Sequence, residues 1–218
     1  MTYICWAALY EGATDRVYFD VLLPRAMEDI TLKIGSHPCV VPPNPAVVLK
    51  RDTTEKVAKE ACAAKDAFHI VFIHSDDGGR ELQANLKART CSYCDAMYKA
   101  CDLPIERCVI IAPRHEVEAW LLSDPFAVTA ALGYNGTPAS LGLPTNVSEA
   151  EKLVDPKKIL ADAVQQVRGA RRELNTTQLY PAIAQRQSLD RLRGSMSFRK
   201  FEAGLKNALV HLGCVARD

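Results

Sequence analysis

The pattern of apolar and polar residues predicts short buried strands that alternate with amphipathic helices. The segment YICWAALY (3–10) is short and rich in aromatic and apolar residues, which is typical of a buried strand. FHIVFIHSDDGG (68–79) and RCVIIA (107–112) follow the same pattern, and each runs into turn-forming residues. A stretch punctuated by prolines allows one further short strand near 46–50.

Between these strands, apolar residues recur every three or four positions, which predicts amphipathic helices. The first helix covers about 14–30, and we expect Pro24 to interrupt it because proline cannot donate a backbone hydrogen bond. Asp52, with Glu55 three residues later, forms a capping-box pattern at the start of the second helix. A long helix is predicted over about 80–101.

The second half of the chain predicts helices without a further strand. One helical pattern covers 116–132, Asp155 is placed to cap a helix that ends near 168, and the last helix stops at Gly213. Strands and helices alternate only in the first part. We therefore expect an α/β domain with a largely parallel sheet flanked by helices over 1–134, and a helical extension packed on it over 135–218.

The composition, 48% hydrophobic and 24% charged, is ordinary for a globular protein. No apolar run is long enough to cross a bilayer, and the first ten residues lack the features of a secretion signal. These observations predict a cytoplasmic protein without membrane association, in which the eight cysteines are reduced thiols. Cys91, Cys94, Cys101 and Cys108 invite a zinc-site interpretation, but three of them share one predicted helix, which favours a buried stripe.

Charge is distributed unevenly along the chain. Residues 157–218 hold twelve basic and five acidic residues, whereas the remainder holds fifteen basic and twenty-one acidic residues. A basic segment beside an acidic one is expected where a carboxylate site handles a polyanion, although solvated helix faces give the same count. The candidate phosphate-binding residues are Arg171, Arg172, Arg193, Arg199 and Lys200.

Acidic residues follow three of the predicted strands at the point where each strand ends. Glu11 follows the first, Asp76 and Asp77 follow the second, and Glu116 and Glu118 follow the third, with one of the last two expected to face the site. The carboxyl ends of parallel strands meet at one edge of a sheet, where ligands bind. Because converging carboxylates repel one another and oxygen ligands select Mg²⁺ or Mn²⁺, the sequence predicts a divalent-metal site for phosphoryl chemistry.

Three of these segments resemble motifs of the TOPRIM superfamily, which topoisomerases, primases and OLD-family nucleases share. They are EGATD (11–15), HSDDGG (74–79) and EVEAWLLSD (116–124). They are most similar to an uncharacterised bacterial TOPRIM-like family with an EG-x-T-E start and an E-A-W-L-L-x-D segment. The resemblance implies a TOPRIM-like fold and a phage-defence-type setting in which an ATPase partner controls the protein.

TOPRIM proteins hold Mg²⁺ with a glutamate on the first strand and a D-x-D pair on a later strand. The resemblance places Glu11 at the glutamate and His74-Ser75-Asp76 at the D-x-D pair, so that histidine replaces the first acid. Imidazole would favour Mn²⁺ over Mg²⁺, unless His74 binds no metal and Asp77 supplies the oxygen. Asp15 matches a second acid of related nucleases, one helical turn from Glu11.

Together, the carboxylates and the resemblance predict a metal-dependent nuclease that hydrolyses phosphodiester bonds in DNA or RNA. Glu11 and Asp76 are the predicted catalytic residues, and two-metal catalysis is the expected mechanism. Two alternatives stay open. One is a non-catalytic TOPRIM-like binding or sensor subunit that has lost its metal through His74, and the other is a zinc-stabilised interaction module built on the cysteines. Asp124, before Pro125, is expected to cap the next helix.

Overall fold

The computed structural model describes residues 1–76, 87–169 and 175–216. Its strands are β1 (Thr2–Tyr3), β2 (Trp6–Leu9), β3 (Cys39–Val40), β4 (Val47–Leu49), β5 (Ile70–His74) and β6 (Cys108–Ile111). Its α-helices are α1 (Ala13–Ile34), α2 (Thr54–Ala63), α4 (Ser92–Cys101), α5 (Val117–Leu122), α6 (Pro125–Leu132), α7 (Val147–Ala150), α8 (Pro156–Arg168), α9 (Tyr180–Arg186), α10 (Leu189–Leu192) and α11 (Met196–His211). A π-helical turn, η2 (Lys87–Cys91), precedes α4.

Four strands form a parallel sheet in the order β4-β2-β5-β6. Ala8 of β2 lies opposite Val48 of β4 on one side and Phe72 of β5 on the other, and Phe72 pairs in turn with Val109 of β6. The short strands β1 and β3 form a separate parallel pair. The predicted α/β class, with a largely parallel sheet flanked by helices, is therefore confirmed.

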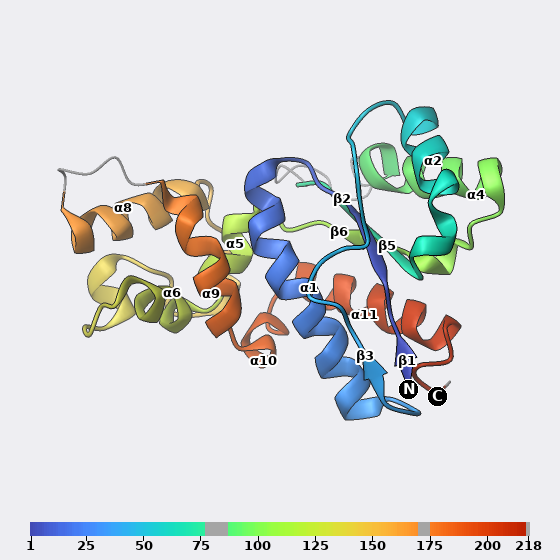
Figure 1. Ribbon diagram of the computed structural model, residues 1–218. Helices are drawn as coiled ribbons and strands as arrows, with labels where there is room; N and C mark the ends of the chain where they lie inside the picture. Colours follow the sequence, from blue (N-terminus) through green and yellow to red (C-terminus); the bar gives the residue numbers. More distant parts are fainter. Residues whose placement is uncertain (77–86, 170–174, 217–218) are drawn as a thin grey trace.

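Alternate residues of each central strand face opposite layers of helices, as the period of a strand requires. Trp6 and Ala8 belong to the hydrophobic cluster that also contains residues of α1 and α11. Ala7 and Leu9 belong to a second cluster with residues of α2 and α4. Figure 1 shows α2 and α4 on one side of the strands, with α1 and α11 on the other. The sheet is thus buried on both faces, which explains why its strands are almost wholly apolar.

The path of the chain creates a switch point between β2 and β5. From β2 the chain passes through α1, on one face, to β4. It then passes through α2, on the other face, to β5, and α4 continues on that second face. The neighbouring strands β2 and β5 therefore send the chain to opposite faces at their carboxyl ends. Such a divergence opens a crevice, and this is where open α/β sheets bind their ligands.

Two local predictions in the first part of the chain are wrong. Helix α1 continues through Pro24 without interruption, and this proline is buried beside Leu22 and Leu23. Burial of that apolar face offsets the loss of one backbone hydrogen bond. The N-cap of α2 is Thr53, whose hydroxyl accepts a hydrogen bond from the Lys56 amide (3.4 Å). Asp52 instead forms an ion pair with the Lys56 ammonium (3.0 Å).

The prediction that all cysteines are reduced is also wrong. Cys62 of α2 and Cys101 of α4 form a disulfide between neighbouring helices, although 39 positions separate them in the sequence. Cys101 is therefore not available to a zinc site with Cys91, Cys94 and Cys108, so a four-cysteine site does not form. Cys94 is buried in the cluster beneath α4, as expected for a core residue. Of the helix predicted over 80–101, residues 77–86 lie outside the described residues.

The helix boundaries in the second half agree closely with the sequence patterns. Asp124 caps α6, and Asp155 caps α8 by accepting a hydrogen bond from the Lys158 amide (2.8 Å). Gly133 and Gly213 have φ values of 67° and 72°, the left-handed conformation that ends many helices. Among the described residues, no strand follows β6. These four signals are local in sequence, and they are all confirmed.

Side chains from both halves of the chain share one hydrophobic core. The Trp120 ring of α5 packs edge-on against Phe198 of α11 (ring centroids 5.1 Å apart) and also contacts Phe201 (5.6 Å). Phe201 lies 6.3 Å from Phe72 of the central sheet. The division at residue 134 stays a prediction, since this cluster includes residues on both sides of it. Within the described ranges, every helix is too short or too polar to cross a membrane.

Candidate active site

Glu11 and Asp76 meet at the switch point of the sheet, just beyond the carboxyl ends of β2 and β5. The Glu11 Oε2 atom accepts a hydrogen bond from the Asp76 amide (2.9 Å) and a second from the Ser75 hydroxyl (3.1 Å). Glu11 is exposed, whereas Ser75 is buried. The structure therefore brings together the two predicted catalytic residues, although 65 positions separate them in the chain.

His74, the residue that replaces the first acid of the D-x-D pattern, lies between two carboxylates. Its Nε2 atom lies 3.2 Å from Asp76 Oδ1, and its Nδ1 atom lies 3.5 Å from Asp15 Oδ2. The Glu11 amide donates to Nδ1 (3.4 Å), and the fully buried ring packs against Phe19 (centroids 4.7 Å apart). A neutral imidazole with its proton on Nε2 would donate to Asp76 and accept from Glu11. Both ring nitrogens thus have partners inside the protein.

The start of α1 positions Asp15. Gly12 precedes the helix in an extended conformation, and its amide donates to Asp15 Oδ2 (2.8 Å). This contact satisfies one of the free amides at a helix N-terminus, where a carboxylate is also favoured by the helix dipole. Only 13% of the Asp15 side chain is exposed. The same carboxylate therefore caps α1 and faces His74.

Glu116 and Glu118 lie at the start of α5, which follows β6. Glu118 is buried, and its Oε1 atom accepts a hydrogen bond from the Tyr180 hydroxyl of α9. Glu116 is the N-cap residue of α5, and it follows His115, whose φ of 67° is left-handed. The Glu116 Oε2 atom is buried and has no hydrogen-bond partner among the described residues. A buried oxygen of this kind is costly unless something further occupies the site.

We call Glu11, Asp15, Asp76, Glu116 and Glu118 the acidic edge. Burial raises the pKa of Asp76, and the charges of Glu11 and Glu118 raise it further, although the hydrogen bond from His74 opposes them. Burial likewise raises the pKa of Asp15, with a contribution from Asp76. Glu11, Asp15, Asp76 and Glu118 therefore lie close enough for their charges to influence one another.

Two members of the acidic edge differ in their balance of charges. Burial and the neighbouring Glu118 raise the pKa of Glu116, and Lys157 only partly compensates. Burial by itself would raise the pKa of Glu11. The hydrogen bonds from Asp76 and Ser75 and the charge of Arg51 outweigh this effect and hold the pKa below its usual value. Excess negative charge is thus concentrated around Asp76 and Glu116.

This excess charge and the unpartnered Glu116 oxygen fit a divalent cation bound by oxygen ligands. Among the described residues, however, no three members of the acidic edge place their ligand atoms within 4.8 Å of one another. Mg²⁺ is usually held by one or two carboxylates together with water and substrate phosphates. The arrangement therefore suits a cation that is shared with a phosphate-containing ligand, and it does not form a cage made by the protein alone.

Arg51 belongs to the same region, and the sequence analysis missed it. Its Nη1 atom donates to the His74 carbonyl oxygen (3.1 Å), and its charge contributes to the low pKa of Glu11. Arg51 lies two positions beyond the last residue of β4, Leu49, so it occupies the same edge of the sheet. The strand predicted near 46–50 places Arg51 at this edge, but a single basic residue after a strand does not by itself indicate a binding site. Arg89 also reaches this region and donates to the Asp76 carbonyl oxygen (3.5 Å).

The predicted phosphate-binding residues are not all brought to the acidic edge. Arg193 forms ion pairs with three carboxylates, those of Asp29, Asp190 and Glu202. The Arg199 guanidinium donates to the carbonyl oxygens of Arg193 and Gly194. Asp77, Arg171 and Arg172 lie outside the described residues.

Lys200 is placed differently from these arginines. It is exposed on α11 and lines a cavity of about 180 Å³ with Ile110 and Ala112, at the carboxyl end of β6. Lys200 therefore lies near the carboxyl end of β6, although no residue of the acidic edge lines this cavity.

The fold and these side chains define an α/β protein with carboxylates gathered at the carboxyl edge of a parallel sheet. The chain belongs to the family described as Domain of unknown function (DUF4276), whose model matches residues 10–206. The matched range includes the whole acidic edge, from Glu11 to Glu118. Comparisons with curated proteins and with solved structures find no significant match.

Proposed function

We propose that the protein is a divalent-metal-dependent nuclease that hydrolyses phosphodiester bonds in DNA or RNA. The observation that carries this proposal is the convergence of carboxylates from the ends of three strands, where Asp76 and Glu116 have raised pKa values. The unpartnered Glu116 oxygen adds to it. The resemblance of residues 11–15, 74–79 and 116–124 to TOPRIM motifs supports the same conclusion.

In this proposal Glu11 and Asp76 hold Mg²⁺ or Mn²⁺, with an oxygen from Glu116 or Glu118. When bound, the cation would activate water and stabilise the leaving oxygen. His74 acts as a positioning residue, because its ring nitrogens engage Asp76 and Asp15 and so fix where these carboxylates point. This role differs from the metal-ligand role that the TOPRIM pattern assigns to the same position.

Basic residues near the carboxyl edge of the sheet would bind the substrate phosphates. Arg51 and Arg89 already contact backbone oxygens of the β5 end, and Lys200 lies at the β6 end. Guanidinium and ammonium groups neutralise phosphates without reading base identity. We therefore expect little dependence on base sequence and a strong dependence of binding on salt concentration.

The remaining parts of this proposal rest on the TOPRIM resemblance alone. They are a phage-defence-type role and control by an ATPase partner. The proposed action in the cytoplasm rests instead on the sequence, in which no apolar run is long enough to cross a bilayer. Both sides of the predicted domain boundary near residue 134 contribute to the proposed site, since the acidic edge lies before it and Lys200 lies after it.

The test combines metal binding with cleavage, so that a missing partner does not hide the result. Glu11→Gln and Asp76→Asn remove one charge each with little change of shape, and Asp162→Asn is the control because Asp162 forms an exposed ion pair with Lys158. Calorimetry should show Mn²⁺ binding to the wild type and to the control. Binding should weaken by about a hundredfold or more in both edge variants.

Cleavage is measured with plasmid, single-stranded DNA and RNA in the presence of Mg²⁺ or Mn²⁺. We expect metal-dependent cleavage by the wild type and the control, with loss of activity in Glu11→Gln and Asp76→Asn. Equal Mn²⁺ affinity in the wild type and both edge variants would refute the metal site. A wild type that binds no Mn²⁺ at all would instead support the non-catalytic binding or sensor subunit.

A further inference from the structure

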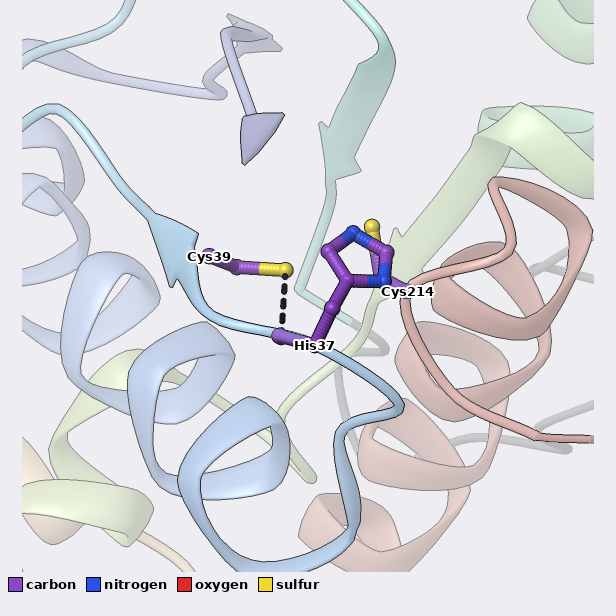
Figure 2. A group of neighbouring side chains, drawn as sticks. All are labelled: His37, Cys39 and Cys214. Carbon is purple, nitrogen blue, oxygen red and sulfur yellow. Dashed lines mark hydrogen bonds between the residues drawn. The ribbon is translucent and has the colours of Figure 1, made fainter. Parts of the chain in front are cut away.

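A second group of metal-ligating side chains lies far from the acidic edge. The ligand atoms of His37, Cys39 and Cys214 are all within 4.8 Å of one another, as Figure 2 illustrates. His37 follows α1, Cys39 begins β3, and Cys214 follows α11. The 22 residues of α1 span about 33 Å from the acidic edge to this end of the molecule. The group is therefore independent of the proposed nuclease site.

Backbone contacts hold the three side chains in place from both sides. The Ser36 amide donates to the Cys214 carbonyl oxygen (2.9 Å), and Gly35 forms an antiparallel bridge with Val215. On the other side, β3 pairs with β1, so the N-terminal strand is part of the same assembly. Figure 1 shows the segment that follows α11 close to β1 and β3. The ligands thus come from three segments that meet here already.

Interactions of the side chains also orient them. The Thr2 hydroxyl and His37 Nε2 form a hydrogen bond (2.8 Å), which fixes the plane of the imidazole ring. Outer hydrogen bonds of this kind commonly orient the histidines of metal sites. The Cys39 thiol contacts the His37 carbonyl oxygen (3.5 Å), the interaction that Figure 2 marks with a dashed line. Burial and the neighbouring Cys39 thiol raise the pKa of Cys214 to about 12.

The chemistry of these ligands selects zinc. Thiolate sulfur and imidazole nitrogen are the standard ligands of structural and catalytic zinc, whereas Mg²⁺ and Ca²⁺ require oxygen. In a tetrahedral zinc site, bond lengths of about 2.0–2.3 Å place ligand atoms about 3.5–3.8 Å apart. Because the three ligand atoms already lie within 4.8 Å of one another, modest side-chain movements would complete the geometry.

We propose that His37, Cys39 and Cys214 form a zinc site that fastens the segment after α11 to β3. The protein supplies three ligands, and water completes the tetrahedron, because His37 and Cys39 are only half-buried. On binding, the two thiols release their protons and the zinc ion compensates both thiolate charges. The site stabilises the contact between β3 and the segment after α11, and it takes no part in the chemistry at the acidic edge.

The test measures zinc content and cobalt spectra of protein purified with a reductant that keeps the thiols free. The variant Cys39→Ser/Cys214→Ser removes both sulfur ligands. The control is Cys94→Ser/Cys108→Ser, which also replaces one buried and one half-buried thiol that are close neighbours. We expect about one zinc per wild-type and control chain, thiolate-to-cobalt charge-transfer bands after exchange, and a loss of about a hundredfold or more in affinity for Cys39→Ser/Cys214→Ser.

His37→Gln provides a second variant should the double serine variant fail to fold. Chelation should lower the melting temperature of the wild type and leave that of His37→Gln unchanged. The proposal is overturned if reduced wild-type protein binds no zinc and gives no thiolate-to-cobalt bands. It is also overturned if Cys39 and Cys214 form a disulfide whose reduction restores no zinc binding. Glu11→Gln should keep the cobalt bands, which separates this site from the acidic edge.

Discussion

Glu151 holds the N-terminus of α11, and its replacement gives a quantitative test of the packing. Glu151 is 8% exposed, and its two carboxylate oxygens accept four hydrogen bonds. These come from the Ser195 hydroxyl (2.5 Å), the Met196 amide (3.1 Å) and the amide and hydroxyl of Ser197 (3.0 and 2.8 Å). The Ser197 hydroxyl also accepts from the Trp120 indole (2.7 Å). The network therefore connects α11 to α5, the helix that carries Glu118 of the acidic edge.

Glu151→Gln keeps the shape of the side chain and removes its charge. Hydrogen bonds to a charged acceptor contribute about 1.5–3 kcal/mol each, against about 0.5–1.5 kcal/mol for neutral ones. The new NH₂ group of the glutamine would also face hydrogen-bond donors and would find no acceptor there. Because the four bonds share two oxygens and are not additive, we expect a loss of about 3 kcal/mol in the free energy of unfolding. For a chain of this size, the melting temperature should fall by about 6–12 °C.

The pH dependence of this loss follows from the pKa of Glu151. Burial by itself would raise this pKa. The hydrogen bonds from Ser195, Ser197 and Met196 outweigh burial and hold the pKa below the ordinary value of 4.5. A lowered folded-state pKa contributes stability that is complete above the unfolded value and disappears as the pH falls through the folded value. The difference between wild type and Glu151→Gln should therefore be constant near neutral pH and narrow below about pH 4.5.

Urea denaturation followed by circular dichroism, repeated from neutral to acidic pH, measures both effects. Glu149→Gln is the matched control, because Glu149 lies on α7 two positions away and is exposed. We expect a much smaller change in the control. Equal stability of Glu151→Gln and Glu149→Gln would contradict this role of the Glu151 hydrogen bonds. A difference from wild type that does not narrow on acidification would contradict it as well.

Three further changes test other parts of the structure. Because burial and neighbouring carboxylates raise the pKa of Asp76, its ionised form destabilises the metal-free fold, and this cost grows as the pH rises above the ordinary value of 3.8. In EDTA at neutral pH, Asp76→Asn should therefore melt at a higher temperature than the wild type, and a lower one would contradict the charge repulsion. Cys62→Ser/Cys101→Ser should lose about 4 kcal/mol of unfolding free energy under non-reducing conditions, given the 39-residue separation, and unchanged stability would count against the disulfide. Tyr180→Phe leaves the buried Glu118 carboxylate without its hydroxyl donor and should lose about 1–3 kcal/mol in urea denaturation, whereas a neutral result would show that another donor replaces it.

Features that depend on neighbouring residues could be predicted from the sequence. The caps at Asp124 and Asp155 were identified correctly because an N-cap and its amide are three positions apart. Thr53 could not be distinguished from Asp52 as the N-cap of α2, because both residue types cap helices. In the structure, Asp52 forms an ion pair with Lys56, and Thr53 caps the helix. Pro24 was misjudged because the stabilisation of α1 comes from packing against the core, which sequence spacing does not report.

Contacts between distant segments required the tertiary structure. The bond between Cys62 and Cys101 joins two helices whose neighbourhood depends on the crossovers of the sheet. Tyr180 reaches Glu118 across 62 positions, and no local pattern signals it. Arg51 follows a predicted strand, but its link to His74 depends on the strand order.

The sequence by itself determined that carboxylates gather at one edge of a parallel sheet, because strand periodicity and the acids that follow each strand are local features. Glu11 and Asp76 were placed together on that basis, and the hydrogen bond between them agrees. Only the tertiary structure decided that the two ring nitrogens of His74 contact Asp15 and Asp76. It also decided that His37 lies beside Cys214. Those outcomes depend on side-chain packing and strand order, which join residues that the linear pattern leaves far apart.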